Sequence, residues 1–434
     1  MTVPRILLIN PWIHDFAAFD LWSKPLGLLY VAECLRRKGV EVTLLDCLDV
    51  SSEKKYGTGH FLKQEIPKPT ALKGIRRRYS RYGISEQAFL DSLESFYKPD
   101  VVLVTSMMTY WYPGAFRIIE LVREHLPKTP IVLGGVYATL CHEHASRFSG
   151  ADHVHVGKVG KDFFELLSRY MPIDVQEKED PVMDCCPAID LMTEPRYGIM
   201  TTSEGCPFRC PYCASDILNP CFRQKSHERC FEEIFWMCRT LNLSDIAFYD
   251  DALLVSAKTH LIPLMEMTCE SGLNTRFHVP NGLHVREITS EVAMVLKRSG
   301  FKTIRLGLEM VESASGRTLD DKTSYAELSE AISALKGAGF EDSEIGVYLL
   351  SGLPAQTREE VEESMRKVKE AGARPYLSEF SPIPGTKIWE AAREASPYPI
   401  EEEPLFQNPS LSPCAPEGYT VERFGWRRSI LRNQ

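Results

Sequence analysis

Three cysteines in one short segment are the residues of this sequence best suited to chemistry. Cys206, Cys210 and Cys213 follow the spacing CxxxCxxC. Thiolates are the usual ligands of iron-sulfur clusters, and a cubane cluster has one more iron than this segment has cysteines. Three protein ligands would therefore leave one iron open to a small molecule, as a catalytic metal site requires. Zinc, which would need a fourth ligand, and buried structural thiols are the alternatives.

The remaining cysteines show no second cluster spacing. Cys34, Cys47 and Cys141 fall in or beside apolar segments, where a thiol usually packs as a small hydrophobic side chain. An auxiliary cluster assembled from the scattered cysteines is an alternative. Cys414 could also fold back as a ligand or a hydrogen donor.

The three-cysteine segment follows the first strand of an alternating series. Strands are predicted at 197–202, 245–249, 275–279, 303–309, 345–350 and 376–380, and helices at 227–241, 259–271, 290–299, 325–338, 358–371 and 387–394. Six such units form most of a barrel, with functional residues on the loops after the strands. We therefore expect a partial (β/α)6 barrel of the TIM type over 196–392, after a proline-rich linker at 171–195 and before a tail or cap at 393–434.

The first part of the chain predicts a second α/β domain. Strands at 5–9, 40–46, 100–105, 131–134 and 153–156 alternate with helical stretches at 26–37, 116–126, 141–148 and 161–170. This pattern indicates a doubly wound parallel sheet over 1–170 with ligands at the carboxyl ends of its strands. A basic insertion at about 51–84 interrupts the pattern. It is either a solvated surface, a basic lid or a patch for an anionic ligand.

The cysteine segment, with Tyr212 before its last cysteine and a six-unit barrel behind it, resembles the radical S-adenosylmethionine superfamily. The resemblance implies that the three cysteines hold a 4Fe-4S cluster whose open iron chelates S-adenosylmethionine. Reductive cleavage would then give methionine and a 5'-deoxyadenosyl radical that takes hydrogen from the substrate. Stretches that match the family in order imply that S-adenosylmethionine is bound by Tyr212, Asp250, Gly307, Glu309 and Gly352, with Tyr212 near the adenine.

A physical argument for these positions stands beside the resemblance. Asp250 and Glu309 fall at predicted strand ends, where a carboxylate can accept from an ammonium group or a ribose hydroxyl. Gly307 and Gly352 let the backbone come close to a ligand. A solvated or helix-capping role is the alternative for both acids and for the neighbouring Asp251.

The first domain resembles the cobalamin-binding domain of the large B12-dependent subclass. The resemblance rests on the segment PLGLLY at 25–30 and on residues that it implies as cobalamin contacts, namely Ser106, Gly134, Gly135, Tyr137 and Gly157. The DxHxxG loop of many cobalamin proteins is absent, and His14, in the equivalent loop, is a candidate ligand to cobalt. A hydrogen-bonding His14, a plain tight turn at the glycine pair and a domain that has lost its cofactor are the alternatives.

Together these features predict a radical S-adenosylmethionine enzyme that methylates an unactivated carbon with the help of cobalamin. Rearrangement, cyclisation or carbon-carbon bond formation without methyl transfer is the alternative reaction, and a corrinoid or iron-sulfur carrier is the alternative outside catalysis. We expect a small-molecule or peptide substrate, an external electron donor of the flavodoxin or ferredoxin type, and a cytoplasmic, anoxic setting. The net charge of -9 argues against nucleic acid, no segment is long enough to span a membrane, and the catalytic acid, base or hydrogen donor is not indicated.

Overall fold

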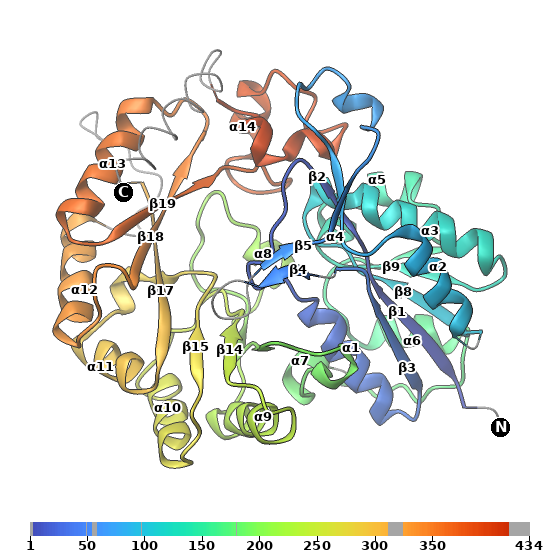
Figure 1. Cartoon of the computed structure of the whole chain (residues 1–434), viewed down its shortest axis with the longest axis horizontal. Coiled ribbons are helices and arrows are strands. Elements are labelled where there is room, and N and C mark those ends of the chain that lie inside the picture. Colours follow the sequence, from blue (N-terminus) through green and yellow to red (C-terminus); the bar gives the residue numbers. More distant parts are fainter. Residues whose placement is uncertain are drawn as a thin grey trace.

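The computed structural model describes residues 3–48, 50–53, 59–96, 98–178, 180–310 and 324–415. Two α/β lobes lie side by side, each with its own parallel sheet (Figure 1). The predicted fold class, a doubly wound sheet followed by a partial barrel, is confirmed. The boundaries drawn at 170, 196 and 392 stay predictions.

The N-terminal lobe is built on five parallel strands in the order β10-β9-β8-β1-β3. They are β1 (Arg5–Asn10), β3 (Glu41–Asp46), β8 (Val101–Val104), β9 (Ile131–Leu133) and β10 (His153–Val154). Chain order reverses between β1 and β8, and this reversal is where ligands bind in open α/β sheets. Both faces of the sheet are apolar, because helices cover each of them.

The two faces carry separate apolar cores. On one face, α1 (Leu26–Arg37) and α6 (Lys161–Ser168) pack against Ile6, Leu8 and Leu103. On the other face, α2 (Glu86–Ser95), α3 (Tyr112–His125) and α4 (Val136–Leu140) pack against Leu7, Ile9 and Val102. The side chains thus alternate between the two cores along β1, as the period of a strand requires.

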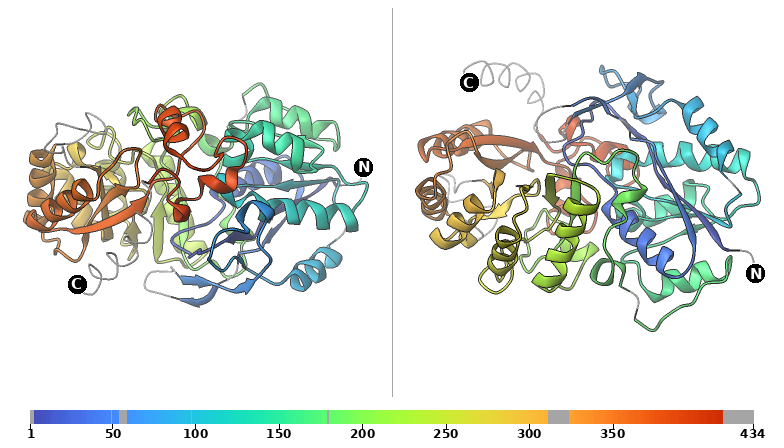
Figure 2. Two further views of the ribbon diagram at one scale, coloured as in Figure 1. Left: turned by 90° about the horizontal axis from the view of Figure 1, so that it is seen from above. Right: turned by 60° about the horizontal axis from the view of Figure 1, so that its bottom comes forward.

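The C-terminal lobe is a curved sheet with helices along its outer side (Figures 1 and 2). Its strands, all parallel and in chain order, are β11 (Gly198–Met200), β14 (Asp245–Phe248), β15 (Arg276–His278), β17 (Phe301–Glu309), β18 (Ile345–Ser351) and β19 (Arg374–Glu379), with β16 (Leu283–His284) pairing onto β17. The helices are α9 (His227–Thr240), α10 (Leu261–Glu270), α11 (Ser290–Arg298), α12 (Tyr325–Gly337), α13 (Arg358–Glu370) and α14 (Trp389–Ala395). Capping boxes at Ser324 and Thr357 set the starts of α12 and α13.

Several short elements were not predicted. They are the antiparallel sheet of β2 (Ile13–Asp15), β6 (Lys63–Glu65) and β7 (Ser80–Tyr82), the ladder of β4 (Val50–Glu53) and β5 (Gly59–Phe61), the helices α2, α4, α7 (Pro181–Asp184) and α8 (Ser215–Leu218), and the pair β12 (Ser203–Glu204) and β13 (Arg223–Gln224). The strands among them are short and mostly polar, so they lack the apolar runs that mark the strands of the two large sheets. The helix predicted at 141–148 is α5 (His142–Phe148), which follows α4 after a single residue.

Contacts between residues far apart in the chain join the lobes. Lys225 of the barrel is fully buried and its Nζ donates to Glu233 Oε1 (2.8 Å) and to the hydroxyl of Tyr30 on α1 (2.9 Å). The segment 404–411, with two 3-10 turns, runs between the lobes (Figure 2, left). Asn408 in this segment donates to the buried Asp15 of β2 (2.8 Å). The predicted cap at 393–434 is therefore folded as far as 415, and its remainder lies outside the described residues.

No helix among the described residues has both the length and the apolar character needed to cross a bilayer.

Candidate cofactor site between the two lobes

The segment that carries the three cysteines is a closed loop. It leaves β12 and returns in β13, and the two strands pair antiparallel, Ser203 with Gln224 and Glu204 with Arg223. Gly205 begins the loop with φ +75°, and a side chain there would bring Cβ to 2.8 Å from the carbonyl oxygens of Asn219 and Cys221. Only glycine fits both the dihedral angle and the space.

The carboxylate of Asp250 anchors the start of this loop. Asp250 is 4% exposed. Its Oδ1 accepts from the backbone N–H and hydroxyl of Ser203 (2.7 and 2.6 Å) and from the hydroxyl of Thr202 (2.8 Å), and both oxygens accept from the Thr202 N–H. A carboxylate held by this many donors is a positioning group. Its contact with S-adenosylmethionine stays a prediction.

The cysteine side chains are partly exposed and none of the three forms a disulfide. The backbone turns tightly between the last two, since Cys213 N–H donates to Cys210 O (3.2 Å). The Cys213 sulfur lies 3.2 Å from the hydroxyl of Ser215, which donates to Asp251 (2.9 Å). Across the described ranges no three His, Cys, Asp or Glu side chains converge as a ready metal site. Three accessible thiols on a short loop after a strand are nevertheless the donor set that an iron-sulfur cluster takes.

The other predicted S-adenosylmethionine contacts lie around this loop. Tyr212 packs in an apolar cluster with Leu353, which follows Gly352 in the chain. Gly352 follows β18 with φ +87°, and a Cβ added there would meet nothing within 4 Å, so its backbone borders open space. Glu309 ends β17 at a shift of register and has φ +65°. A left-handed glutamate costs energy and is most often found at functional sites.

An aromatic contact ties the cysteine loop to the barrel interior. The imidazole of His284 stacks on the ring of Phe208, with centroids 3.9 Å apart and planes at 22°. Phe208 lies between the first two cysteines, and His284 is paired in register with Gly307. Sequence reasoning missed this pair, because neither residue is part of a periodic pattern or a metal-ligand spacing.

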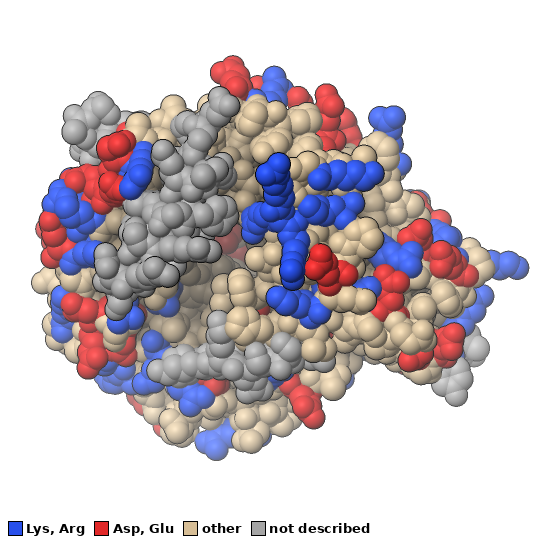
Figure 3. Space-filling model, turned by 45° about the horizontal axis from the view of Figure 1, so that its top comes forward, with Lys and Arg blue, Asp and Glu red and all other residues tan. Residues whose placement is uncertain are grey.

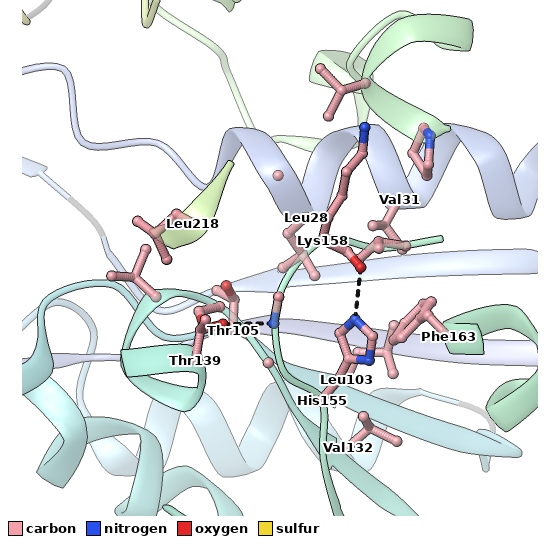
Figure 4. A pocket seen from close by; sticks show the side chains of 18 of the residues that line it. Leu28, Val31, Leu103, Thr105, Val132, Thr139, His155, Lys158, Phe163 and Leu218 are labelled. Carbon is pink, nitrogen blue, oxygen red and sulfur yellow. Dashed lines mark hydrogen bonds between the residues drawn. The ribbon is translucent and has the colours of Figure 1, made fainter. Parts of the chain in front are cut away.

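A cavity of about 290 Å³ opens beside the loop, on the carboxyl-end side of the N-terminal sheet. Figure 4 shows Leu28 and Val31 of α1 on one side of it and Leu103 and Val132 of the sheet on the other. Its other lining residues are Gly27, Val104, Thr105, Gly134, Gly135, Val136, Thr139, His155, Gly157, Lys158, Val159, Phe163, Pro181, Val182, Glu204, Leu218 and Asn219. Since Glu204 ends β12, and Leu218 and Asn219 belong to the cysteine loop, the cavity lies where the two lobes meet.

The lining is suited to part of a large, mostly apolar ligand. The cavity volume is at the lower end of ordinary ligand pockets, which span about 300–1,000 Å³. Gly134 and Gly157 line it, and a Cβ added to either would have no atom within 4 Å, so they open the wall to a ligand. Gly135 has a different role: an added Cβ would meet Ser106 O at 2.2 Å, so this glycine is required by the tight turn itself.

The other predicted cobalamin contacts lie outside this lining. Ser106 donates its hydroxyl to Gly134 O (2.6 Å) and so supports the turn. Tyr137 is buried with its hydroxyl 2.6 Å from Nδ1 of His144. His14 lies in β2, near the rings of Trp12 and Tyr79. Their cobalamin contacts stay predictions, and the geometry gives each of the three a packing role.

An ionic network spans the cavity mouth. Lys158 Nζ donates to Glu204 Oε2 (2.6 Å) and Asp180 Oδ2 (2.9 Å), and Arg223 pairs with the same two acids. The network thus joins a loop of the N-terminal lobe, the linker and both strands of the cysteine hairpin. Sequence reasoning missed it, because its members are far apart in the chain.

Comparison with known proteins identifies both lobes. Residues 200–368 match the family model of the Radical SAM superfamily, and residues 71–167 match that of the B12 binding domain. The C-terminal lobe thus carries a radical SAM domain. The B12 binding match covers more than half of the N-terminal lobe, so both predicted resemblances are confirmed.

Relatives of known or proposed activity match over most of the chain. An uncharacterized methyltransferase of Pyrococcus horikoshii is 25% identical over 349 residues, 71% of this chain and 73% of the relative. The hopanoid C-3 methylase of Methylococcus capsulatus is 22% identical, with 89% and 72% covered. The radical S-adenosylmethionine methyltransferase TsrM of Kitasatospora setae, solved with cobalamin and a 4Fe-4S cluster, superposes with a TM-score of 0.62 at 16% identity, with 92% and 80% covered.

Proposed function

We propose that this protein is a cobalamin-dependent radical S-adenosylmethionine methyltransferase. The observation that supports this most is the shared interface: the cysteine loop itself forms one wall of the cavity in the B12 binding lobe. A carrier of electrons alone would not need its cluster loop to line a second cofactor's cavity. Methyl transfer to an unactivated carbon of a small-molecule or peptide substrate is the reaction that both cofactors together allow.

The protein's own residues hold the cluster-binding loop in position and shield the cavity from water. Cys206, Cys210 and Cys213 would hold the cluster, which supplies the electron that cleaves S-adenosylmethionine. Asp250 and Gly205 fix the backbone that presents those thiols. Leu103, Val132 and their neighbours give the cavity an apolar wall that excludes water.

The cluster is tested by reconstitution under anoxic conditions. The protein should take up about four irons and release 5'-deoxyadenosine from S-adenosylmethionine under dithionite. Cys210→Ala should lose both, and Cys269→Ala, an exposed cysteine on α10, should lose neither. A Cys210→Ala variant that still cleaves S-adenosylmethionine would refute the assignment.

Cobalamin binding is tested at Gly134, where an added side chain would enter open space. Gly134→Val should fill the cavity and weaken hydroxocobalamin binding at least about tenfold, the loss of about 1.4 kcal/mol, with the midpoint of thermal unfolding nearly unchanged. Gly337→Ala on α12, which also has free space, is the matched control. If the protein binds no corrinoid at all, radical chemistry without methyl transfer becomes the better assignment.

The same proposal includes an external one-electron donor, because cleavage of S-adenosylmethionine consumes an electron. It also includes a reducing cytoplasm without oxygen, because oxygen oxidises reduced iron-sulfur clusters that have an open iron. An acidic chain with a net charge of -9 remains a poor general partner for nucleic acid.

A further inference from the structure

The insertion in the N-terminal lobe carries a concentration of positive charge. Between residues 63 and 81 every charged residue except Glu65 is basic, in a chain whose net charge is -9. Figure 3 shows Lys and Arg side chains gathered on one face of the molecule with few acidic side chains among them. A local positive field on an acidic protein is strong enough to steer a negatively charged partner.

The basic residues of the insertion divide into an inward and an outward set. Arg81 pairs with Glu86 (2.8 Å), and Arg77 donates to Ser410 O (2.8 Å). The outward set, which we call the basic face, consists of Lys63, Lys73, Arg76 and Arg78, all exposed. Within the described ranges its one ion pair is Arg78 with Glu65 at 3.7 Å, with both side chains well solvated.

The basic face has the form of a contact surface for a macromolecule. None of its four residues lines the cavity between the lobes. Lys63 begins β6, Lys73 follows the 3-10 turn at 70–72, and the two arginines lie between that turn and β7. A small anion is bound by donors that converge around it. Positive charges spread over an exposed face instead suit a macromolecule with a complementary negative surface.

The basic face is also close, through packed segments, to the cysteine loop. Arg77, in the same turn, contacts Ser410 in the segment 404–411. Phe406 of that segment packs in the apolar cluster that contains Tyr212 of the cysteine loop. A chain of packed contacts therefore connects the insertion that carries the basic face with the cysteine loop.

We propose that the basic face of Lys63, Lys73, Arg76 and Arg78 docks an acidic one-electron carrier protein that reduces the cluster. This rests on the proposed function, which requires one electron for each S-adenosylmethionine cleaved. The carrier is oxidised by one electron and the cluster is reduced by one. Cleavage of the sulfonium then consumes that electron. A protein carrier with an acidic surface satisfies both the charge and the redox requirement, which nucleic acid and lipid do not.

The experiment compares two reductants on the full-length reconstituted protein. Formation of 5'-deoxyadenosine is measured with a reduced acidic flavodoxin and, separately, with dithionite. The double variant Lys73→Glu/Arg76→Glu should lose at least about tenfold in the flavodoxin-supported rate at low ionic strength, with the difference shrinking as salt rises. Its dithionite-supported rate should equal that of the unchanged protein, which also shows that it folds.

The matched control carries the same charge change elsewhere. Lys98 and Lys128 are exposed near the amino ends of β8 and β9, and Lys98→Glu/Lys128→Glu should keep both rates. The proposal would be overturned if the variant lost both rates equally or kept its flavodoxin-supported rate. It would also be overturned if the variant lost binding to single-stranded RNA while the flavodoxin-supported rate was unchanged. Absence of 5'-deoxyadenosine with either reductant in the unchanged protein would instead refute the proposed function.

Discussion

At the scale of single residues, Asp250 holds the start of the loop that carries the three cysteines of the proposed cluster site. Asp250 is predicted to contact S-adenosylmethionine, which stays a prediction, and the structure gives its carboxylate five hydrogen bonds from Thr202 and Ser203. Both uses fall at a strand end, so the sequence position alone could not separate them.

Replacing Asp250 by Asn distinguishes the two roles. The NH2 group of an asparagine would face N–H or hydroxyl donors of Thr202 and Ser203 and could not accept from them. Each buried donor left without an acceptor costs about 1–3 kcal/mol of stability. We expect Asp250→Asn to lower iron content after reconstitution together with the free energy of unfolding. Asp251→Asn, with one hydrogen bond from Ser215, is the control. A variant that retains full iron and stability but needs more S-adenosylmethionine would make Asp250 a ligand contact.

His14 gives the protein an acid-sensitive position. Burial, with the nearby Arg81 charge, lowers the pKa of His14 to about 4 from its usual 6.5. The unfolded chain therefore binds a proton before the folded one does, and stability is lost as pH falls from about 6.5 to 4. The full loss is about 3 kcal/mol. Denaturant titrations across this range should show His14→Gln with a correspondingly weaker pH dependence than the unchanged protein, whereas equal slopes would refute a neutral buried imidazole.

At the scale of elements, ion pairs connect the β12–β13 hairpin with the loop around Gly157 beside the cavity. Lys158 reaches from the N-terminal lobe to Glu204 on β12 and to Asp180 in the linker. These side chains are 30%, 10% and 18% exposed, so solvent screens the pairs only in part.

Lys158→Glu should break this connection. It would place a third carboxylate beside Glu204 and Asp180, and we expect a loss of about 1 kcal/mol or more in stability with faster release of hydroxocobalamin. Lys161→Glu, which alters an exposed pair with Glu177, should change neither. Release rates can be followed by corrinoid absorbance after dilution, and an unchanged rate would show that the network does not close the cavity.

At the scale of the whole molecule, a buried charge pair of the C-terminal lobe hydrogen-bonds to the N-terminal lobe. Lys225 and Glu233 are both fully buried, and the hydroxyl of Tyr30 on α1 completes the set from the other lobe. Burial raises the pKa of Glu233, while the neighbouring Lys225 opposes that rise.

Lys225→Met would remove the hydrogen-bonded cation of the buried Glu233 and leave only Arg229, whose Nε lies 3.5 Å from Oε1. We expect it to lower the free energy of unfolding by about 3–5 kcal/mol and to separate the unfolding of the two lobes into two transitions in denaturant. Lys225→Met/Glu233→Leu should recover most of that loss. The exposed α13 pair offers a comparison, since Arg358→Ala should cost about 0.5 kcal/mol or less.

The fold and the cysteine loop could both be predicted from the sequence, each for a different physical reason. The parallel strands are mostly apolar, even where they are short, and alternate with helices, so all eleven predicted strands have a counterpart in the two large sheets. The cysteine spacing is local and needs no tertiary information. Contacts such as Phe208 with His284, or Lys158 with Glu204, join segments that only the folded chain brings together. Those contacts were therefore beyond sequence reasoning.

The bond between Asn408 and Asp15 has a consequence for the order in which the protein is made. The residues are 393 positions apart, and burial raises the pKa of the Asp15 carboxyl, which also accepts from Trp111. During translation the N-terminal lobe emerges first and waits for the partner of this carboxyl until nearly the whole chain has been synthesised. Until Asn408 has been synthesised, the donors to Asp15 are Trp111 and the backbone N–H of Phe16, so the completion of this buried site is a late, long-range step in folding.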